Sequence, residues 1–136
     1  MAAAPARVLL IEDDALDQSL FRRTLAKTKA DIVCTATLEE GLERLREGGF
    51  DLIVSDLGLP DSRWDETYAK LEAASNDVPV VLITGHQAFV DQLGGGDGYQ
   101  RPYVFLKSSV HHDIFPLVAL GRMLEHLIDA EGGGEA

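Results

Sequence analysis

Five short apolar runs alternate along the chain with stretches long enough to form helices. The runs lie at residues 7–11, 32–35, 52–55, 79–83 and 103–106. Strand-length runs separated by helix-length segments are typical of parallel strands joined by right-handed helical crossovers. Because the runs are almost continuously apolar rather than alternating, each strand is expected to be buried on both faces. The pattern predicts an α/β fold, a doubly wound five-stranded parallel sheet.

The predicted sheet has the order 2-1-3-4-5 of flavodoxin-like (βα)5 folds, which reverses between the first and third strands. In such sheets ligands bind outside the carboxyl ends of the strands, at the reversal. Glu12 and Asp13 directly follow the first run, and Asp56 directly follows the third. Clustered carboxylates repel one another, and a hard divalent cation with oxygen ligands relieves that repulsion. The sequence therefore predicts a divalent-metal site at this edge.

The segments between the runs carry helix signals. Asp14 is predicted to cap the first helix, whose apolar residues include Leu16 and Phe21. Thr37 and Glu40 have the spacing of a capping box for the second helix. The third and fourth helices are predicted at residues 64–74 and 87–93. The fourth should be short, because a glycine-rich run at 94–98 follows it.

A last helix is predicted at residues 110–128, and it carries more large apolar residues than one face against the sheet would use. The excess predicts an exposed apolar strip beside the fifth strand, a surface for a homodimer or a downstream protein. A broad apolar face covered by neighbouring loops explains the same pattern equally well.

Composition narrows the class of protein. The formal net charge of −11 argues against nucleic acid or an anionic membrane as partner. No apolar run approaches the length of a membrane helix. Cys34 is the only cysteine, so no disulfide framework is expected and a cytoplasmic setting follows. Residues 1–6 are expected to be a disordered extension, and residues 130–136 a flexible acidic, glycine-rich tail.

Four motifs together give the chain a family resemblance: LLIEDD at 9–14, SDLGLPD at 55–61, LITG at 82–85 and FLK at 105–107. In this order and spacing they resemble the response-regulator receiver domain of two-component signalling, of the single-domain, chemotaxis-regulator-like type. The resemblance covers roughly residues 7–128, and the expected receiver domain is residues 7–129. Little chain remains for an output domain, so the resemblance implies output through protein contacts.

The resemblance implies a phosphoacceptor and a Mg²⁺ site. A phosphoryl group would pass from a histidine kinase or histidine phosphotransfer protein to Asp56. Mg²⁺ would be held by Asp13, the Asp56 side chain and the Gly58 backbone carbonyl, with Glu12 holding a metal-bound water. The protein would promote its own phosphorylation and dephosphorylation, and no separate substrate turnover is expected, so it is not classed as an enzyme.

Further residues are implied by the same resemblance. Thr84 would donate its hydroxyl hydrogen to the phosphoryl group, and Lys107 would balance its charge. His86 is singled out by its position instead: it stands two residues after Thr84, next to Gly85, and should lie near the site entrance, where the two can tune the access of the hydrolytic water.

Two positions depart from the common receiver pattern. Val104 stands where an aromatic switch residue is common, and Ser108 stands where a proline is usual. Tyr103 and Phe105 flank Val104, and strand alternation directs these two aromatics, the possible switch residues, to the other face. The departures favour an alternative function, a pseudo-receiver that binds a protein partner without phosphorylation. A hydrolase with an aspartate nucleophile is disfavoured, because Gly58 stands where such enzymes carry a second acid.

Overall fold

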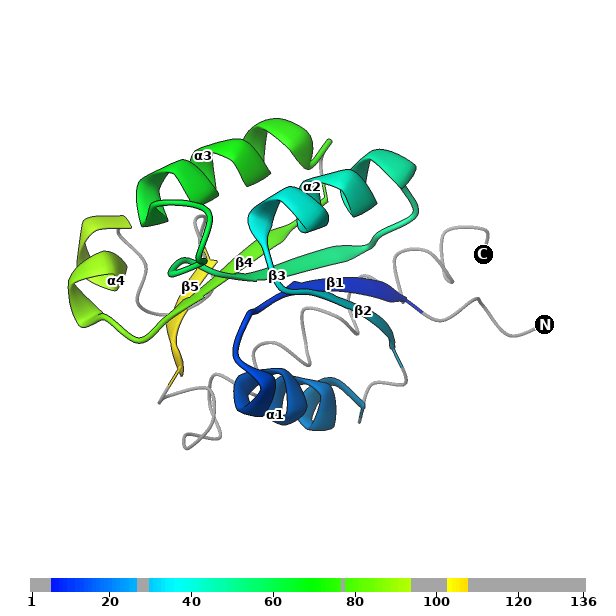
Figure 1. The fold of residues 1–136 in the computed structure, drawn as a ribbon, viewed down its shortest axis with the longest axis horizontal. Coiled ribbons are helices and arrows are strands. Elements are labelled where there is room, and N and C mark those ends of the chain that lie inside the picture. The colour runs from blue at the N-terminus through cyan, green and yellow to red at the C-terminus, as the bar shows by residue number, and fades with distance from the viewer. Residues whose placement is uncertain (1–5, 27–29, 77, 94–102, 108–136) are drawn as a thin grey trace, which may run out of the picture.

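The computed structural model of the chain describes residues 6–26, 30–76, 78–93 and 103–107. Helices and strands alternate through these ranges (Figure 1). The strands are β1 (Arg7–Ile11), β2 (Asp31–Thr35), β3 (Leu52–Asp56), β4 (Val80–Thr84) and β5 (Tyr103–Leu106). The helices are α1 (Ala15–Ala26), α2 (Leu38–Glu47), α3 (Trp64–Ala74) and α4 (Gln87–Leu93). None of these helices has both the length and the apolar character needed to span a bilayer.

The five strands form one parallel sheet in the order β2-β1-β3-β4-β5, as predicted. β1 and β3 are therefore neighbours, and Ile11 pairs with Ser55 in their register. This pairing brings the residues that follow β1 to the same level as the end of β3. The sheet thus places the acids after β1 beside Asp56.

Helices cover both faces of the sheet: α1 lies on one face, and α2, α3 and α4 lie on the other (Figure 1). Alternate residues of each strand enter opposite cores, as the two-residue strand period requires. Leu10 and Val54 pack with Phe21 on the α1 face. Leu9 and Ile53 pack with residues of the three other helices, Leu38, Leu71 and Val90. This double burial explains why the strand sequences are almost continuously apolar.

The predicted helix caps are present. Asp14 Oδ1 accepts the backbone N–H of Asp17 at 3.0 Å, at the start of α1. Thr37 Oγ1 accepts the backbone N–H of Glu40 at 3.2 Å, and also donates to Glu40 Oε1 at 3.1 Å. The side chain of Glu40 therefore contacts the hydroxyl group of Thr37 and not the backbone N–H of Thr37. Gly48, with a φ of 80°, ends α2 in a conformation that side chains rarely adopt.

Asp61 gives α2 a second cap that sequence reasoning missed. Its Oδ1 accepts the N–H of Leu38 at 2.9 Å, and its Oδ2 accepts the N–H of Glu39 at 3.0 Å. Slight burial raises the pKa of Asp61, but the backbone hydrogen bonds outweigh it and hold the pKa below its usual value. The loop after β3 is thereby tied to the start of α2.

Several details differ from the sequence prediction. β2 begins one residue earlier, β3 extends to Asp56, and β4 is displaced by one residue, to Val80–Thr84. Leu16, assigned to the apolar face of the first helix, is 68% exposed. Ala6 is buried, and its carbonyl accepts the N–H of Asp31 at 2.8 Å. The fourth helix occupies the predicted residues 87–93. The glycine run at 94–98, the helix at 110–128, Ser108 and the tails at 1–5 and 130–136 lie outside the described residues.

Gly41 of α2 is buried and packs tightly against the β1 residue Ile11. A Cβ atom built on Gly41 would overlap Ile11 Cδ1 and lie 2.8 Å from Ile11 Cγ1. We expect Gly41→Ala to lower the free energy of unfolding by about 1 kcal/mol, because overpacking outweighs the helix propensity gained. Urea denaturation provides the measurement. The control is Glu43→Ala, at an exposed position on the same helix, which should change the free energy of unfolding by less than about 0.5 kcal/mol. A Gly41→Ala protein more stable than the wild type would contradict the tight packing.

Candidate functional site

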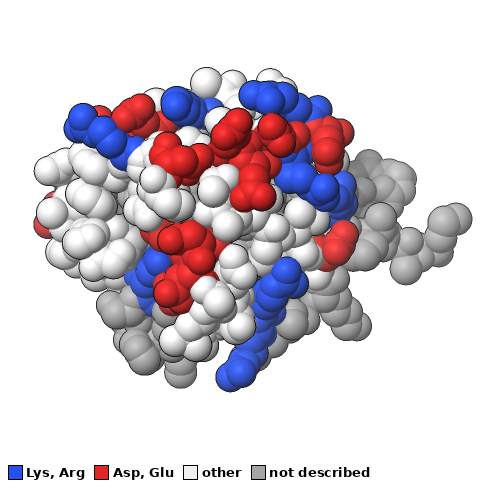
Figure 2. Space-filling view, viewed as in Figure 1, with Lys and Arg blue, Asp and Glu red and all other residues white. Residues whose placement is uncertain are grey.

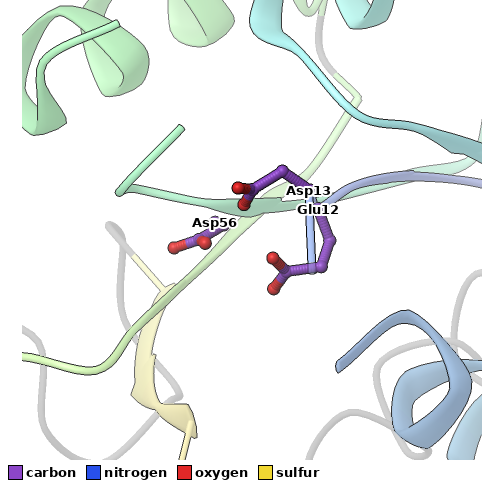
Figure 3. A group of neighbouring side chains, drawn as sticks. All are labelled: Glu12, Asp13 and Asp56. Atoms are coloured by element: carbon purple, nitrogen blue, oxygen red, sulfur yellow. The ribbon is translucent and has the colours of Figure 1, made fainter. Parts of the chain in front are cut away.

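Three carboxylates meet at the carboxyl ends of β1 and β3. Oxygen atoms of Glu12, Asp13 and Asp56 all lie within 4.8 Å of one another. Figure 3 shows the three side chains turned toward one shared region. Glu12 is fully buried and Asp56 is 5% exposed, whereas Asp13 is exposed. The sheet register brings these acids together, as the sequence predicted.

Lys107 lies at the centre of the acidic group. It follows β5, yet its Nζ lies 2.9 Å from Glu12 Oε1, from Asp56 Oδ2 and from Asp17 Oδ2. Burial lowers the pKa of Lys107, but the hydrogen bonds that it donates to Asp17 and Asp56 and its ion pair with Glu12 outweigh burial and raise the pKa well above its usual value. The lysine is therefore a permanent cation in the cleft.

Glu12 has the most strongly shifted pKa among the acids that the structure describes. Burial raises its pKa to about 7; the charge of Asp56 adds to this effect, while Lys107 opposes it. Its Oε2 accepts the backbone N–H of Asp14 at 3.1 Å. Its backbone carbonyl accepts Gln18 Nε2 from α1. Glu12 is thus held at its side chain and at its backbone.

The two oxygens of Asp56 have different partners. Oδ1 accepts the backbone N–H of Gly58 at 2.9 Å, and Oδ2 accepts Lys107 Nζ at 2.9 Å. Gly58 also lines the cleft, and a Cβ atom there would only come into ordinary contact with Asp56. These two hydrogen bonds fix the orientation of the Asp56 carboxylate.

Thr84 closes the other side of the cleft. It ends β4, is 1% exposed, and its Oγ1 accepts the backbone N–H of His86 at 3.1 Å. The hydroxyl hydrogen remains for a second acceptor. Gly85 and His86 line the same cleft, which has a volume of about 310 Å³. Figure 2 shows acidic side chains gathered in the middle of this face of the molecule, with basic atoms beside them.

The aromatics of β5 lie away from the cleft. Tyr103 and Phe105 pack in the core on the α1 face, and Val104 packs in the core on the opposite face. The predicted alternation is confirmed. Neither aromatic is among the described residues that line the cleft. A second aromatic group lies nearer: His86 contacts Phe89 at a centroid distance of 5.0 Å, and Phe89 stacks on Trp64 at 4.9 Å.

Asp17 is the site residue that sequence reasoning missed. It lies in the first turn of α1, where an acid is expected simply because it favours the helix dipole. Its ionic partner, Lys107, is 90 residues further along the chain. No local pattern connects the two positions, so only the folded structure could reveal the pair.

The donor set fits a hard divalent cation. All three clustered ligand groups are carboxylates, which suit Mg²⁺ better than a softer metal. The buried Glu12 Oε1 has no hydrogen-bond partner among the described residues apart from its ion pair with Lys107, so it can accept a hydrogen from a metal-bound water. Asp13 and Asp56 are the residues that would hold the ion directly. The Gly58 carbonyl remains a predicted ligand.

Residues 8–94 match the family model of the response regulator receiver domain, and the chain belongs to this family. Receiver domains serve two-component systems: they accept phosphoryl groups, bind Mg²⁺ at an acidic site and interact with histidine kinases or phosphotransfer proteins.

Two curated relatives illustrate the similarity. The chain is 30% identical over 102 residues to the cell cycle transcriptional regulator CtrA of Caulobacter vibrioides, covering 71% of this chain and 44% of CtrA. It is 26% identical over 113 residues to the transcriptional regulatory protein GlrR of Escherichia coli, covering 83% of this chain and 25% of GlrR. The chain therefore spans less than half the length of these regulators.

Solved structures show the same fold at low sequence identity. A CheY-like receiver domain protein from Methanospirillum hungatei has a TM-score of 0.68 at 20% identity, covering 96% of this chain and 99% of that one. The receiver domain of the sensor histidine kinase PA1611 from Pseudomonas aeruginosa has a TM-score of 0.70 at 18% identity, covering 92% and 98%. That second structure has a magnesium ion coordinated in its active-site cleft.

Proposed function

We propose that this protein is a phosphoacceptor response regulator whose Asp56 takes a phosphoryl group from a phosphohistidine and which signals through protein contacts. The observation that carries the proposal is the environment of Asp56: a nearly buried carboxylate, oriented by Gly58 and Lys107, beside two more acids. In this proposal residues 7–129 form the receiver domain.

In the transfer, one carboxylate oxygen of Asp56 attacks the phosphorus atom in line with the donor nitrogen. The new O–P bond forms as the P–N bond breaks, and the donor imidazole keeps the electron pair and takes up a proton. Phosphoryl transfer asks the protein mainly for positioning and charge neutralisation. Bound Mg²⁺ would supply positive charge to the phosphoryl oxygens.

The other groups serve the product. Lys107 Nζ already lies 2.9 Å from Asp56 Oδ2, within reach of an added phosphoryl group. Thr84 has its hydroxyl hydrogen available as a donor from the neighbouring strand end. His86, on the cleft rim, is placed to influence the access of water to the aspartyl phosphate.

Intact mass spectrometry after incubation with acetyl phosphate tests the proposal. We expect the wild-type protein to gain the mass of one phosphoryl group only with Mg²⁺ present, and Asp56→Asn to gain none, because an amide is not a nucleophile here. Asp61→Asn, an acid of the same loop outside the cleft, is the matched control and should be modified like the wild type.

Two results would contradict the proposal. Modification of Asp56→Asn to the wild-type extent would place the phosphoryl group on another residue. A wild-type protein that binds Mg²⁺ but accepts no phosphoryl group, from acetyl phosphate or from phosphohistidine donors, would favour the alternative, a partner-binding module that works without phosphorylation. The observation that supports this alternative is Val104, which stands where receiver domains commonly have an aromatic residue.

A further inference from the structure

Asp17 occupies one of the three hydrogen-bond donors of Lys107. The ammonium group has three hydrogens. It hydrogen-bonds to Asp17 Oδ2 and Asp56 Oδ2, both at 2.9 Å, and forms an ion pair with Glu12 Oε1 at the same distance. Three carboxylates thus surround one ammonium group. A phosphoryl group that approaches Lys107 competes with these carboxylates for the same cation.

We propose that Asp17 is a positioning residue that competes with the phosphoryl group for Lys107, and so weakens the cleft's affinity for that group. The inference rests on the proposed function and adds a regulating residue to the same site. It predicts that phosphorylation breaks the Lys107–Asp17 pair and thereby loosens a direct tie between α1 and the end of β5.

Burial identifies Asp17 as the partner that yields. Glu12 is fully buried, so separating it from Lys107 would leave a buried carboxylate without its cation. The Asp17 side chain is 20% exposed on the rim of the cleft, where solvent can replace the lysine. Asp56 receives the phosphoryl group and keeps its place beside Lys107. Asp17 is therefore the carboxylate that can be exchanged at the lowest cost.

Asp17 also acts through its charge. Its carboxylate shares one ammonium group with Asp56, so it lies close to where the negatively charged phosphoryl group would be added. Like charges at such separations repel substantially in a partly buried site. An opposing effect is that Asp17 helps to hold the flexible lysine in place. An asparagine separates the two effects, because it keeps an oxygen acceptor for Lys107 and loses the charge.

The test measures the binding of beryllofluoride, a phosphoryl mimic, by calorimetry at saturating Mg²⁺. We expect Asp17→Asn to bind the mimic about tenfold more tightly than the wild type, equivalent to about 1.4 kcal/mol. Asp14→Asn removes a charge from the same cleft without touching the described contacts of Lys107, and asparagine still caps α1. It should change the affinity by less than about twofold.

Further variants separate a charge effect from a structural one. Asp17→Glu keeps the charge and should bind the mimic with wild-type affinity. Mg²⁺ titrated alone should bind Asp17→Asn no more tightly than the wild type, because the variant is less negative; a distorted cleft would instead weaken both ligands. If Asp17→Asn does not fold, Asp17→Ala takes its place and should still bind the mimic more tightly than the wild type.

Equal or weaker binding of the mimic by Asp17→Asn would overturn the inference and leave the proposed function intact. An equal gain in Asp14→Asn would also overturn it, because the effect would then belong to net charge. A wild-type protein that does not bind the mimic would overturn the proposed function, and the inference with it.

Discussion

Replacing Lys107 by methionine is expected to lower the free energy of unfolding by about 3 kcal/mol at pH 8 in metal-free buffer. The substitution leaves the buried carboxylates of Glu12 and Asp56 without their shared cation. Removing one partner of a buried ion pair costs roughly 3–5 kcal/mol, and the 20% exposure of Lys107 places this case at the lower end. Urea denaturation monitored by circular dichroism provides the measurement.

The loss should depend on pH. Burial raises the pKa of Glu12 from 4.5 to about 7, and Lys107 opposes that rise, so its removal raises the pKa further. The folded protein binds a proton at Glu12 more tightly than the unfolded chain does, so protonation of Glu12 stabilises the fold fully below the unfolded pKa of 4.5. This stabilisation is lost as the pH rises through the folded pKa of about 7. The difference between variant and wild type should therefore be small near pH 5 and grow above about pH 7.

Arg63→Met is the control for loss of a positive charge. Arg63 is 75% exposed, and its ion pairs with Asp65 and Glu66 are on the surface. Surface pairs contribute little, so this variant should lose less than about 1 kcal/mol at any pH. Equal losses in the two variants would show that Lys107 acts only through net charge. Bound Mg²⁺ stabilises any variant with an intact site, so it should stabilise Arg63→Met as much as the wild type. It should stabilise Lys107→Met more, because the site of that variant is more negative.

Replacing Phe21 by alanine is expected to lower the free energy of unfolding by roughly 3–5 kcal/mol. Phe21 is fully buried, and it packs from α1 against strand residues that include Leu10 and Val54. Truncation removes a large apolar area and leaves a cavity that the rigid sheet cannot fill. Thermal and urea unfolding both measure the effect.

Leu16→Ala is the matched control for Phe21→Ala, since both lie on α1 and both lose a large apolar side chain. Leu16 is 68% exposed, so its truncation should change stability by less than about 0.5 kcal/mol. A large loss at Leu16 would mean that another surface covers this position. Phe21→Ala has a second expected effect if the variant stays folded. A less firmly packed α1 should weaken the contact between Asp17 and Lys107. The affinity of the cleft for Mg²⁺ or for a phosphoryl mimic should then change.

Local patterns were sufficient to predict the strands, their order and the caps of the first two helices. Asp14 and Thr37 accept the backbone N–H groups that their positions predicted, because capping involves residues only three apart. The start of α2 shows where this reasoning ends. Its second cap, Asp61, comes from a loop more than twenty residues away, and nothing near Leu38 in the sequence indicates it.

The sequence by itself determined that Glu12, Asp13 and Asp56 would meet, because apolar strands ending in acids converge at one edge of a parallel sheet. Only the tertiary structure decided what surrounds them. It buried Glu12 and left its neighbour Asp13 exposed, turned Leu16 toward solvent, and brought Asp17 to Lys107 across 90 residues. Strand and cap signals depend on backbone geometry over a few residues. The partner of an ion pair and the burial of a carboxylate depend on how separate elements pack, and no local pattern contains that information.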